Sequence, residues 1–135
     1  MKRLLRYLNE TIDVPRIIGA DSLTAFKTWV DADYAVHDDM KSHTGGVMSF
    51  EHGVINAKSL KQKLNVKSST EAEVVGASNY VPWVIWVVKF MNHQGFNMDS
   101  NIFCQDNLSA VKIEKNGRKS CGQKSKHIDI RYFFY

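Results

Sequence analysis

The pattern of hydrophobic and polar positions predicts short strands in the first half of the chain. Residues 2–9 place leucines on one side and basic residues on the other, which favours a short amphipathic helix. A helix this short is marginal on its own, so we expect it to dock on another element. β-Branched, aromatic and apolar residues predict strands at 24–31, 45–50 and 54–58, with residues 51–53 as a hairpin loop.

The longest helical pattern covers residues 70–92. Its apolar residues lie nearly all round the helix, which predicts a helix buried between two layers. Pro82 favours a kink in this helix, and Gly95 marks its end. Residues 100–105 then predict a fourth strand, and residues 108–114 a second, shorter helix.

The order of these elements predicts the fold class. Three strands, a helix, a strand and a helix describe a hairpin meander followed by an α/β unit, which favours an α/β domain with a mixed sheet. Residues 116–126 are rich in glycine and lysine and have no apolar pattern, so they predict a loop. A chain of 135 residues has the usual size of one domain with a real hydrophobic core.

Charge and cysteine content narrow the function classes only slightly. The net charge of +4 permits a polyanionic partner without establishing one. Cys104 and Cys121 form no Cys-x-x-Cys motif and no zinc-finger spacing with histidines, so we expect reduced thiols and an intracellular protein. The most apolar run, residues 81–91, is too short to cross a bilayer, and we expect no membrane association.

The start of the long helix carries one glutamate more than a helix cap needs. Ser68 stands three residues before Glu71, and Thr70 stands three before Glu73, so either pair could form a capping box. Side chains two apart on a helix do not share a face, so one carboxylate is left over. The helix dipole alone favours acids at this position.

Two further acids lie at comparable places in the predicted fold. Asp31 ends the first predicted strand and Asp106 follows the fourth. In open α/β sheets the functional crevice lies at the carboxyl ends of strands, and carboxylates that meet there repel one another unless a cation is bound. Oxygen ligands suit Mg²⁺ or Mn²⁺, and pairs of such ions hydrolyse phosphodiesters. Scattered strand-end acids without a shared role are the alternative.

Six short segments follow one another in a fixed order along the chain. They are residues 30–35, 41–46, 58–62, 68–73, 104–110 and 126–132. Together they resemble the ribonuclease H (RNase H) domain of Ty1/copia-type retrotransposon polyproteins. Residues 2–11 resemble the tail of the reverse-transcriptase connection that precedes this domain. The resemblance therefore assigns 1–20 to that tail and 21–135 to an RNase H-like domain.

The resemblance implies a mixed sheet, with three antiparallel strands and then a parallel one, flanked by helices. It also implies cleavage of the RNA strand of RNA–DNA hybrids by two Mg²⁺ ions, with Mn²⁺ as a possible substitute. Asp31, Glu73 and Asp106 match the first three of four carboxylate ligands. Asp33 shares a strand face with Asp31 and is its rival for the first position. Glu71 is then the capping partner of Ser68.

The fourth carboxylate is where this sequence departs from the family. In the family it follows the fifth strand, and this chain stops at Tyr135 before any such stretch. We therefore expect a domain truncated at its C-terminus, without the fifth strand, the last helix and the fourth ligand. Asp129 is an alternative source of that ligand, although its segment resembles a helix surface. The missing strand leaves an open sheet edge that favours self-association.

Basic residues in two segments are candidate phosphate contacts, with ordinary solvated lysines as the alternative. They are Lys58, Lys61, Lys63 and Lys67 before the long helix, and Arg118, Lys119, Lys124 and Lys126 after the short one. The expected partners are an RNA–DNA hybrid and the reverse-transcriptase domain of the same polyprotein. Two alternatives remain: a catalytically inactive remnant that only binds nucleic acid or self-associates, and a fragment completed by another segment or copy.

Overall fold

The computed structural model describes residues 1–15, 17–20 and 23–120. The elements follow the predicted order, with three short additional elements: β1, β4 and η1. They are α1 (Lys2–Glu10), β1 (Gly19–Ala20), β2 (Ala25–Asp33), β3 (His43–Ser49), β4 (Glu51–His52), β5 (Val54–Lys61), α2 (Ser69–His93), β6 (Ser100–Cys104), α3 (Leu108–Asn116) and the 3-10 helix η1 (Gly117–Ser120).

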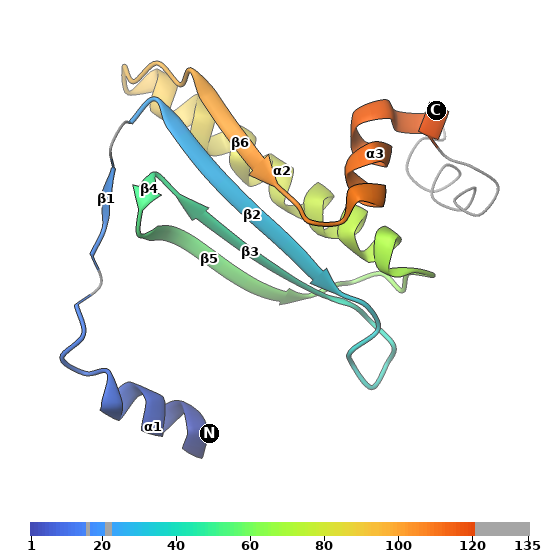
Figure 1. The fold of residues 1–135 in the computed structure, drawn as a ribbon, viewed down its shortest axis with the longest axis horizontal. Coiled ribbons are helices and arrows are strands. Elements are labelled where there is room, and N and C mark those ends of the chain that lie inside the picture. The colour runs from blue at the N-terminus through green and yellow to red at the C-terminus, as the bar shows by residue number, and fades with distance from the viewer. Residues whose placement is uncertain (16, 21–22, 121–135) are drawn as a thin grey trace.

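A four-stranded mixed sheet forms the centre of the domain, with the strand order β5-β3-β2-β6 (Figure 1). β5, β3 and β2 are antiparallel neighbours, and β6 runs parallel to β2. This confirms the predicted mixed sheet of three antiparallel strands and then a parallel one, the arrangement of an RNase H-like fold. The absence of a fifth strand and last helix stays a prediction, because residues 121–135 lie outside the described part of the chain.

Three local predictions were wrong in detail. Glu51 and His52 are more than a hairpin loop, because they form β4 and pair with β1 in a second small sheet. β2 continues two residues past Asp31, so that Asp31 lies inside the strand, where β3 pairs with it. The start of the predicted glycine-rich loop, residues 117–120, is the short helix η1.

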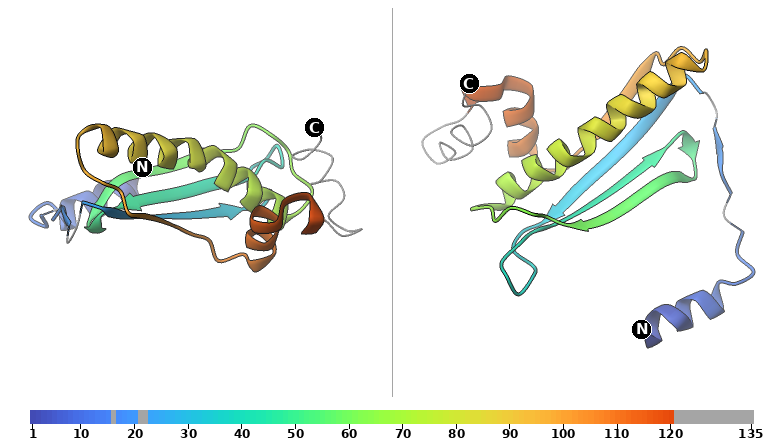
Figure 2. Two further views of the ribbon diagram at one scale, coloured as in Figure 1. Left: turned by 90° about the horizontal axis from the view of Figure 1, so that it is seen from above. Right: turned by 180° about the vertical axis from the view of Figure 1, so that it is seen from behind.

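The core lies between the sheet and α2, which covers one of its faces (Figure 2). Alternate residues of β2 are buried, as a strand with one covered face requires. The larger core cluster consists of Phe26, Val30, Met48, Phe50, Tyr80 and Val84. The Tyr80 hydroxyl donates a 2.8 Å hydrogen bond to the Gly46 carbonyl, so this aromatic ring ties α2 to β3.

The prediction that α2 is buried on all sides was wrong. Residues 71–77 are buried, but Trp83, Trp86 and Phe90 further along are 46–57% exposed. The reason is that the described residues supply one sheet layer, which covers one side of a 25-residue helix. α2 includes Pro82 and is long and apolar enough to cross a membrane by length and composition. A core helix passes the same test, and α2 packs against β2 and β3.

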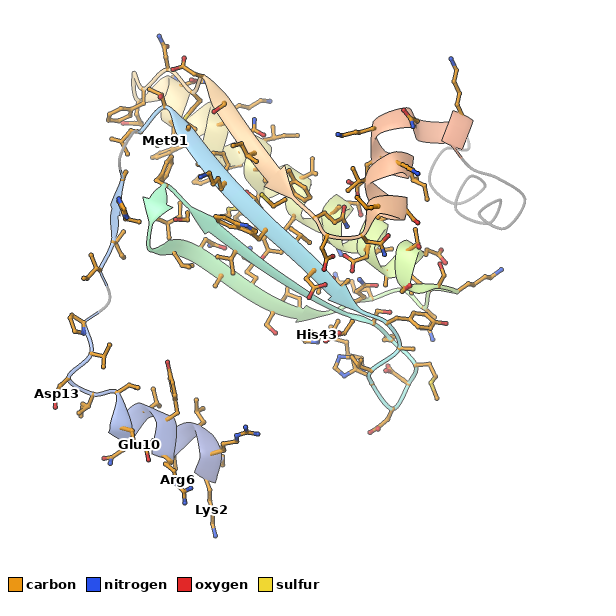
Figure 3. All side chains as sticks on the ribbon, in the orientation of Figure 1. Lys2, Arg6, Glu10, Asp13, His43 and Met91 are labelled. Atoms are coloured by element: carbon orange, nitrogen blue, oxygen red, sulfur yellow. The ribbon has the colours of Figure 1, made fainter. Side chains whose placement is uncertain are left out.

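The N-terminal helix forms as predicted, but it does not dock on the rest of the described chain. α1 has no buried residue, and its three leucines are 52–58% exposed. Figure 3 shows Lys2, Arg6 and Glu10 on a helix that lies apart from the sheet. The short pairing of β1 with β4 holds only the segment between α1 and β2 against the domain. The amphipathic pattern therefore predicts the helix correctly and its packing incorrectly.

The start of α2 assigns separate roles to its two glutamates. Ser68 is the N-cap, and its hydroxyl accepts the Glu71 backbone N–H at 3.1 Å. The Glu71 carboxylate in turn accepts the Lys67 backbone N–H at 2.7 Å, one residue further out than in the usual capping box. Glu71 is only 1% exposed, so this bond supplies a partner for a buried carboxylate. The spare carboxylate is therefore that of Glu73.

We expect the substitution Ser68→Ala to lower the free energy of unfolding by about 1 kcal/mol, the usual cost of losing an N-cap hydroxyl. Urea denaturation of the metal-free protein measures this loss. Ser78→Ala is the matched control, because its hydroxyl donates within α2 to the Val75 carbonyl and caps no helix end. A loss as large in the Ser78 variant would contradict the capping role of Ser68.

Candidate metal centre

Three carboxylates from separate elements converge at one end of β2. Asp31 belongs to β2, Glu73 to the first part of α2, and Asp106 to the turn between β6 and α3. Each offers one oxygen, and these three oxygens all lie within 4.8 Å of one another. Glu73 is 5% exposed, whereas Asp31 and Asp106 are open to solvent. The site thus has a buried floor and an accessible mouth.

The pairing of β2 with β6 explains why two distant aspartates meet. Trp29 is the last residue of β2 in register with β6, and its partner is Cys104. Asp31 and Asp106 each lie two residues further along two parallel neighbours, so they reach the same end of the sheet. Beyond Cys104 strand β6 has ended. The Glu73 carboxylate there receives hydrogen bonds from Gln105 and from the Ala32 backbone.

Burial raises the pKa of the Glu73 carboxyl above its usual value. Two hydrogen bonds oppose this shift, one from Gln105 Nε2 at 3.2 Å and one from the Ala32 backbone N–H. The negative charges of Asp31 and Asp106 raise the pKa of Glu73 further. Ionisation of Glu73 beside the charged Asp31 and Asp106 is therefore unfavourable, and a bound cation would remove this cost.

The residues present fit a divalent cation such as Mg²⁺. All three donors are hard carboxylate oxygens, the ligand type of Mg²⁺ and Mn²⁺. Oxygens on one Mg²⁺ lie at most about 4.2 Å apart, because each bond is about 2.1 Å long. The three oxygens, all within 4.8 Å of one another, are therefore close to the spacing at which they could share a cation. Gln105 Oε1 is also buried without a hydrogen-bond partner among the described residues, so it is a free acceptor beside the acidic group.

Asp33 and Asp129 were the alternative ligands predicted from the sequence. Asp33 lies two residues beyond Asp31 on the same strand and is exposed, but it is not a member of the converging group. The geometry of the described residues therefore favours Asp31 for the first position. Asp129 lies outside the described residues, and its role as a fourth ligand stays a prediction.

A fourth acid near this centre was missed from sequence. Glu114, on α3, is exposed as a whole residue, but partial burial of its carboxyl and the charge of Glu73 raise its pKa to about 7. Nothing in the local sequence distinguishes Glu114 from an ordinary acid on a short helix. Its environment depends on α3 packing against α2, which only the tertiary structure supplies.

Folding raises the pKa of Glu114 from its ordinary value of 4.5 to about 7. At a pH between these two values, the folded protein therefore keeps a proton on Glu114 that the unfolded chain has released. Stability from this group is therefore present below pH 4.5 and is lost as the pH rises through about 7. We expect Glu114→Gln to be more stable, relative to wild type, at pH 8 than at pH 4. Urea denaturation in EDTA at both pH values tests this. An equal difference at both would contradict it. Glu114 remains exposed, so solvent screening keeps the effect small.

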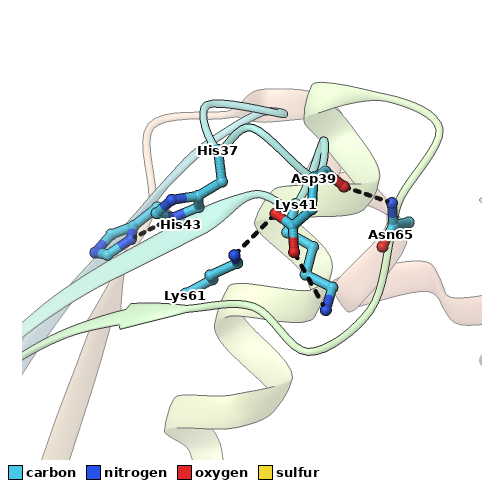
Figure 4. A network of polar contacts seen from close by, with 6 residues as sticks. All are labelled: His37, Asp39, Lys41, His43, Lys61 and Asn65. Carbon is cyan, nitrogen blue, oxygen red and sulfur yellow. Dashed lines mark hydrogen bonds and ion pairs between the residues drawn. The ribbon is translucent and has the colours of Figure 1, made fainter.

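The predicted phosphate-binding residues occupy different environments. The Lys58 ammonium lies over the Trp83 ring, 3.1 Å from its centroid. Lys61 pairs with Asp39 at 2.8 Å, within the polar network of Figure 4. Lys63, Lys67 and Lys119 are exposed. The Arg118 side chain, Lys124 and Lys126 lie outside the described part of the structure, so their predicted contacts stay predictions.

Comparison with known proteins finds relatives of this chain among retrotransposon polyproteins. It is 34% identical, over 98% of its length, to the Retrovirus-related Pol polyprotein from transposon TNT 1-94 of Nicotiana tabacum. It is 31% identical, over 99% of its length, to the corresponding polyproteins from transposons RE2 and RE1 of Arabidopsis thaliana. No protein-family model matches the chain.

The match covers only a small part of each relative. The chain spans about a tenth of their length, 10% for the tobacco polyprotein and 9% for the two from Arabidopsis. The alignments include nearly all of this chain but only a short stretch of each relative, as expected when a chain corresponds to one segment of a multidomain protein. This chain is therefore a homologue of one segment of the retrovirus-related Pol polyproteins of Ty1/copia-type retrotransposons.

Proposed function

We propose that this segment is an RNase H domain that hydrolyses the RNA strand of RNA–DNA hybrids with two divalent ions, Mg²⁺ or Mn²⁺. The observation that carries the proposal is the convergence of Asp31, Glu73 and Asp106 within 4.8 Å at the end of a mixed sheet. Homology to retrovirus-related Pol polyproteins supports it, because the ordered sequence motifs resemble one domain of such a polyprotein. In this proposal residues 1–20 belong to the preceding connection and 21–135 to the nuclease domain.

The chain's own residues have distinct tasks in this chemistry. Bound divalent ions would supply an activated water and a counter-charge for the leaving oxygen. Asp31 and Asp106, on the exposed side of the site, would hold ions where a phosphate can approach. Glu73, on the buried side, is oriented by Gln105 and by the Ala32 backbone. The site needs no covalent nucleophile, because the attacking group is water.

The substrate and partners follow from the same proposal. The net charge of +4 and the exposed lysines near α2 suit a polyanionic duplex. Recognition would rest on the shape of the hybrid and on ribose 2′-hydroxyls, with little dependence on sequence. We infer an intracellular location and a reverse-transcriptase domain in the same polyprotein.

A cleavage assay tests the proposal. Its substrate is an RNA–DNA hybrid whose two strands carry different fluorescent labels. We expect the RNA strand to be cut in Mg²⁺, both strands to survive in EDTA, and a DNA duplex of the same sequence to survive in both. Cutting of the DNA strand, or cutting that persists in EDTA, would refute a metal-dependent RNase H.

An inactive remnant of a retroelement is the second candidate. It is favoured by the edge position of β6, where Ile102 is 45% exposed and the described residues pair only one side of the strand. This candidate predicts hybrid binding or concentration-dependent association without cleavage in Mg²⁺ or Mn²⁺. Analytical ultracentrifugation beside the cleavage assay separates it from the nuclease.

A further inference from the structure

We propose that Ser59, His43 and His37 form a nucleophilic triad that hydrolyses small uncharged esters through an acyl-serine intermediate. His43 Nε2 lies 2.7 Å from Ser59 Oγ, and His43 Nδ1 lies 3.0 Å from His37 Nε2. A nucleophile within hydrogen-bond reach of a base, with a third group on the other nitrogen of that base, is the arrangement of nucleophilic catalysis. Ser59 is exposed and both histidines are half-buried, so a substrate can reach the hydroxyl.

The contacts give each of the three residues a distinct task. In the catalytic tautomer, the Ser59 hydroxyl donates to His43 Nε2, and the His43 Nδ1–H donates to His37 Nε2. His43 is then the general base, because its free lone pair takes the proton of the attacking hydroxyl. His37 does not touch the substrate. It is a positioning residue that fixes the tautomer and the ring orientation of His43.

The loop that carries His37 is held in place by two polar contacts. The His37 backbone N–H donates to the Lys41 carbonyl at 3.2 Å. Asp39, two residues further along, forms an ion pair of 2.8 Å with Lys61 of β5 (Figure 4). The loop is therefore tied to β5, the strand that also carries Ser59. This places His37 beside His43 before any substrate binds, as a catalytic group requires.

The backbone of Ser59 supplies a donor for the oxyanion. The Gln62 N–H donates to the Ser42 carbonyl at 2.8 Å, which continues the β3–β5 register as a hydrogen-bonded pair. Such pairs alternate along antiparallel strands, so Ser59, three residues earlier, belongs to a non-hydrogen-bonded pair and its N–H points away from β3. β5 is an edge strand of the described sheet, so this N–H is open to a substrate carbonyl oxygen.

An apolar cavity beside Ser59 indicates the class of substrate. Ser59 lines a cavity of about 870 Å³ together with Trp29, Val47 and Ala57, which suit a short aliphatic acyl group. Gly45 lies opposite Ser59, and an added Cβ there would meet nothing within 4 Å, so the space beside the hydroxyl is open. The acids of the metal centre also line this cavity, about 10 Å away across β3, and would repel an anion. We therefore expect an uncharged ester.

The reaction balances with water as its only co-reactant. Ser59 Oγ bonds to the carbonyl carbon of the ester while His43 takes the hydroxyl proton. His43 passes this proton to the leaving alcohol as the ester C–O bond breaks, and water then hydrolyses the acyl-serine with His43 again as the base. Neutral His37 stabilises the imidazolium of His43 less than a carboxylate would, so we expect slow turnover and a burst of the first product.

Covalent labelling with a fluorophosphonate probe and hydrolysis of p-nitrophenyl butyrate test the proposal on the full chain. Both are measured in EDTA, so the acidic centre contributes no metal-dependent chemistry, and failure of the nuclease proposal leaves this test unaffected. We expect mass spectrometry to locate the probe on Ser59 and p-nitrophenolate to be released in a burst. Ser59→Ala should lose both signals. Ser78→Ala should keep both, because Ser78 is an exposed serine whose hydroxyl donates to the Val75 carbonyl.

Histidine variants test the other two roles. His43→Gln should slow the labelling of Ser59 by about 100- to 10,000-fold, the usual contribution of a general base. His37→Phe should slow it less, and His37→Glu should restore it, because a carboxylate accepts the same hydrogen bond from His43. A purely structural role of His37 predicts no such rescue. His93→Gln, at an exposed histidine in the last turn of α2, is the matched control and should label at the wild-type rate.

Labelling at a residue other than Ser59, or hydrolysis that survives Ser59→Ala, would overturn the proposal. So would a folded wild-type protein that neither reacts with the probe nor hydrolyses the ester, because the contacts among the three side chains would then be structural only. Urea denaturation of each variant accounts for any loss of folded protein.

Discussion

Replacing Asp31 or Asp106 with asparagine should lower the rate of RNA cleavage by at least about 100-fold. Losing a residue that only supports a metal ligand already costs about 10- to 100-fold in affinity or activity, and these side chains would be ligands themselves. Asparagine has nearly the same shape and both sites are exposed, so the fold should persist. Cleavage of the labelled hybrid measures the rate, and titration calorimetry with Mg²⁺ measures the loss of metal binding.

The same variants should make the metal-free protein more stable at neutral pH. The charges of Asp31 and Asp106 raise the pKa of Glu73, so removing either charge lowers the cost of ionising Glu73. A variant that loses activity and gains stability in EDTA is hard to explain by misfolding. Added Mg²⁺ should stabilise the wild type and have less effect on the variants.

Asp33→Asn is the matched control for these substitutions, because Asp33 is exposed on the same strand and lies outside the converging group. We expect it to keep wild-type cleavage and Mg²⁺ binding. If Asp33→Asn abolishes cleavage while Asp31→Asn does not, Asp33 is the first ligand and the assignment made here is wrong.

Gly46→Ala should destabilise the fold by about 3 kcal/mol or more. A Cβ at this position would overlap the Tyr80 ring, which is itself 1% exposed. Overpacking of a core usually costs about 1–3 kcal/mol, and this overlap is severe. To relieve it, Tyr80 must move and lose its hydrogen bond to the Gly46 carbonyl. Urea denaturation measures the loss.

The neighbouring Gly45→Ala is the control. An added Cβ there meets nothing within 4 Å, and the residue lies in the same strand. Because glycine inside a strand is less stable than alanine by about 0.5–1 kcal/mol, this variant should be neutral or slightly stabilised. Equal losses in both variants would mean that the close approach of Tyr80 to β3 is not what requires Gly46.

The sequence was sufficient where the signal is local. Alternation in β2 and the periodicity of α2 predicted both elements, because each reflects which side chains face a core. Ser68 and Glu71 identified the helix start, because capping groups lie within a few residues of each other. The ordered motifs also led to the polyprotein family, which the comparisons confirm.

Other features were out of reach because they depend on partners far along the chain. The exposed flank of α2 follows from the number of layers packed against it, which periodicity does not encode. Pairing of β1 with β4, the contact of Lys58 with Trp83 and the raised pKa of Glu114 each join segments that no short window contains.

The acidic centre shows most clearly which features the sequence predicts and which depend on the tertiary structure. The sequence alone supplied the identities of Asp31, Glu73 and Asp106 and the elements to which they belong, although it placed Asp31 at the end of its strand and not inside it. Only the tertiary structure decided that their oxygens meet within 4.8 Å, through the parallel register of β2 and β6. It also excluded Asp33 from the group and added Gln105 as the side chain that orients Glu73. The physical reason is that propensity acts between neighbours in sequence, whereas strand register and burial act between neighbours in space.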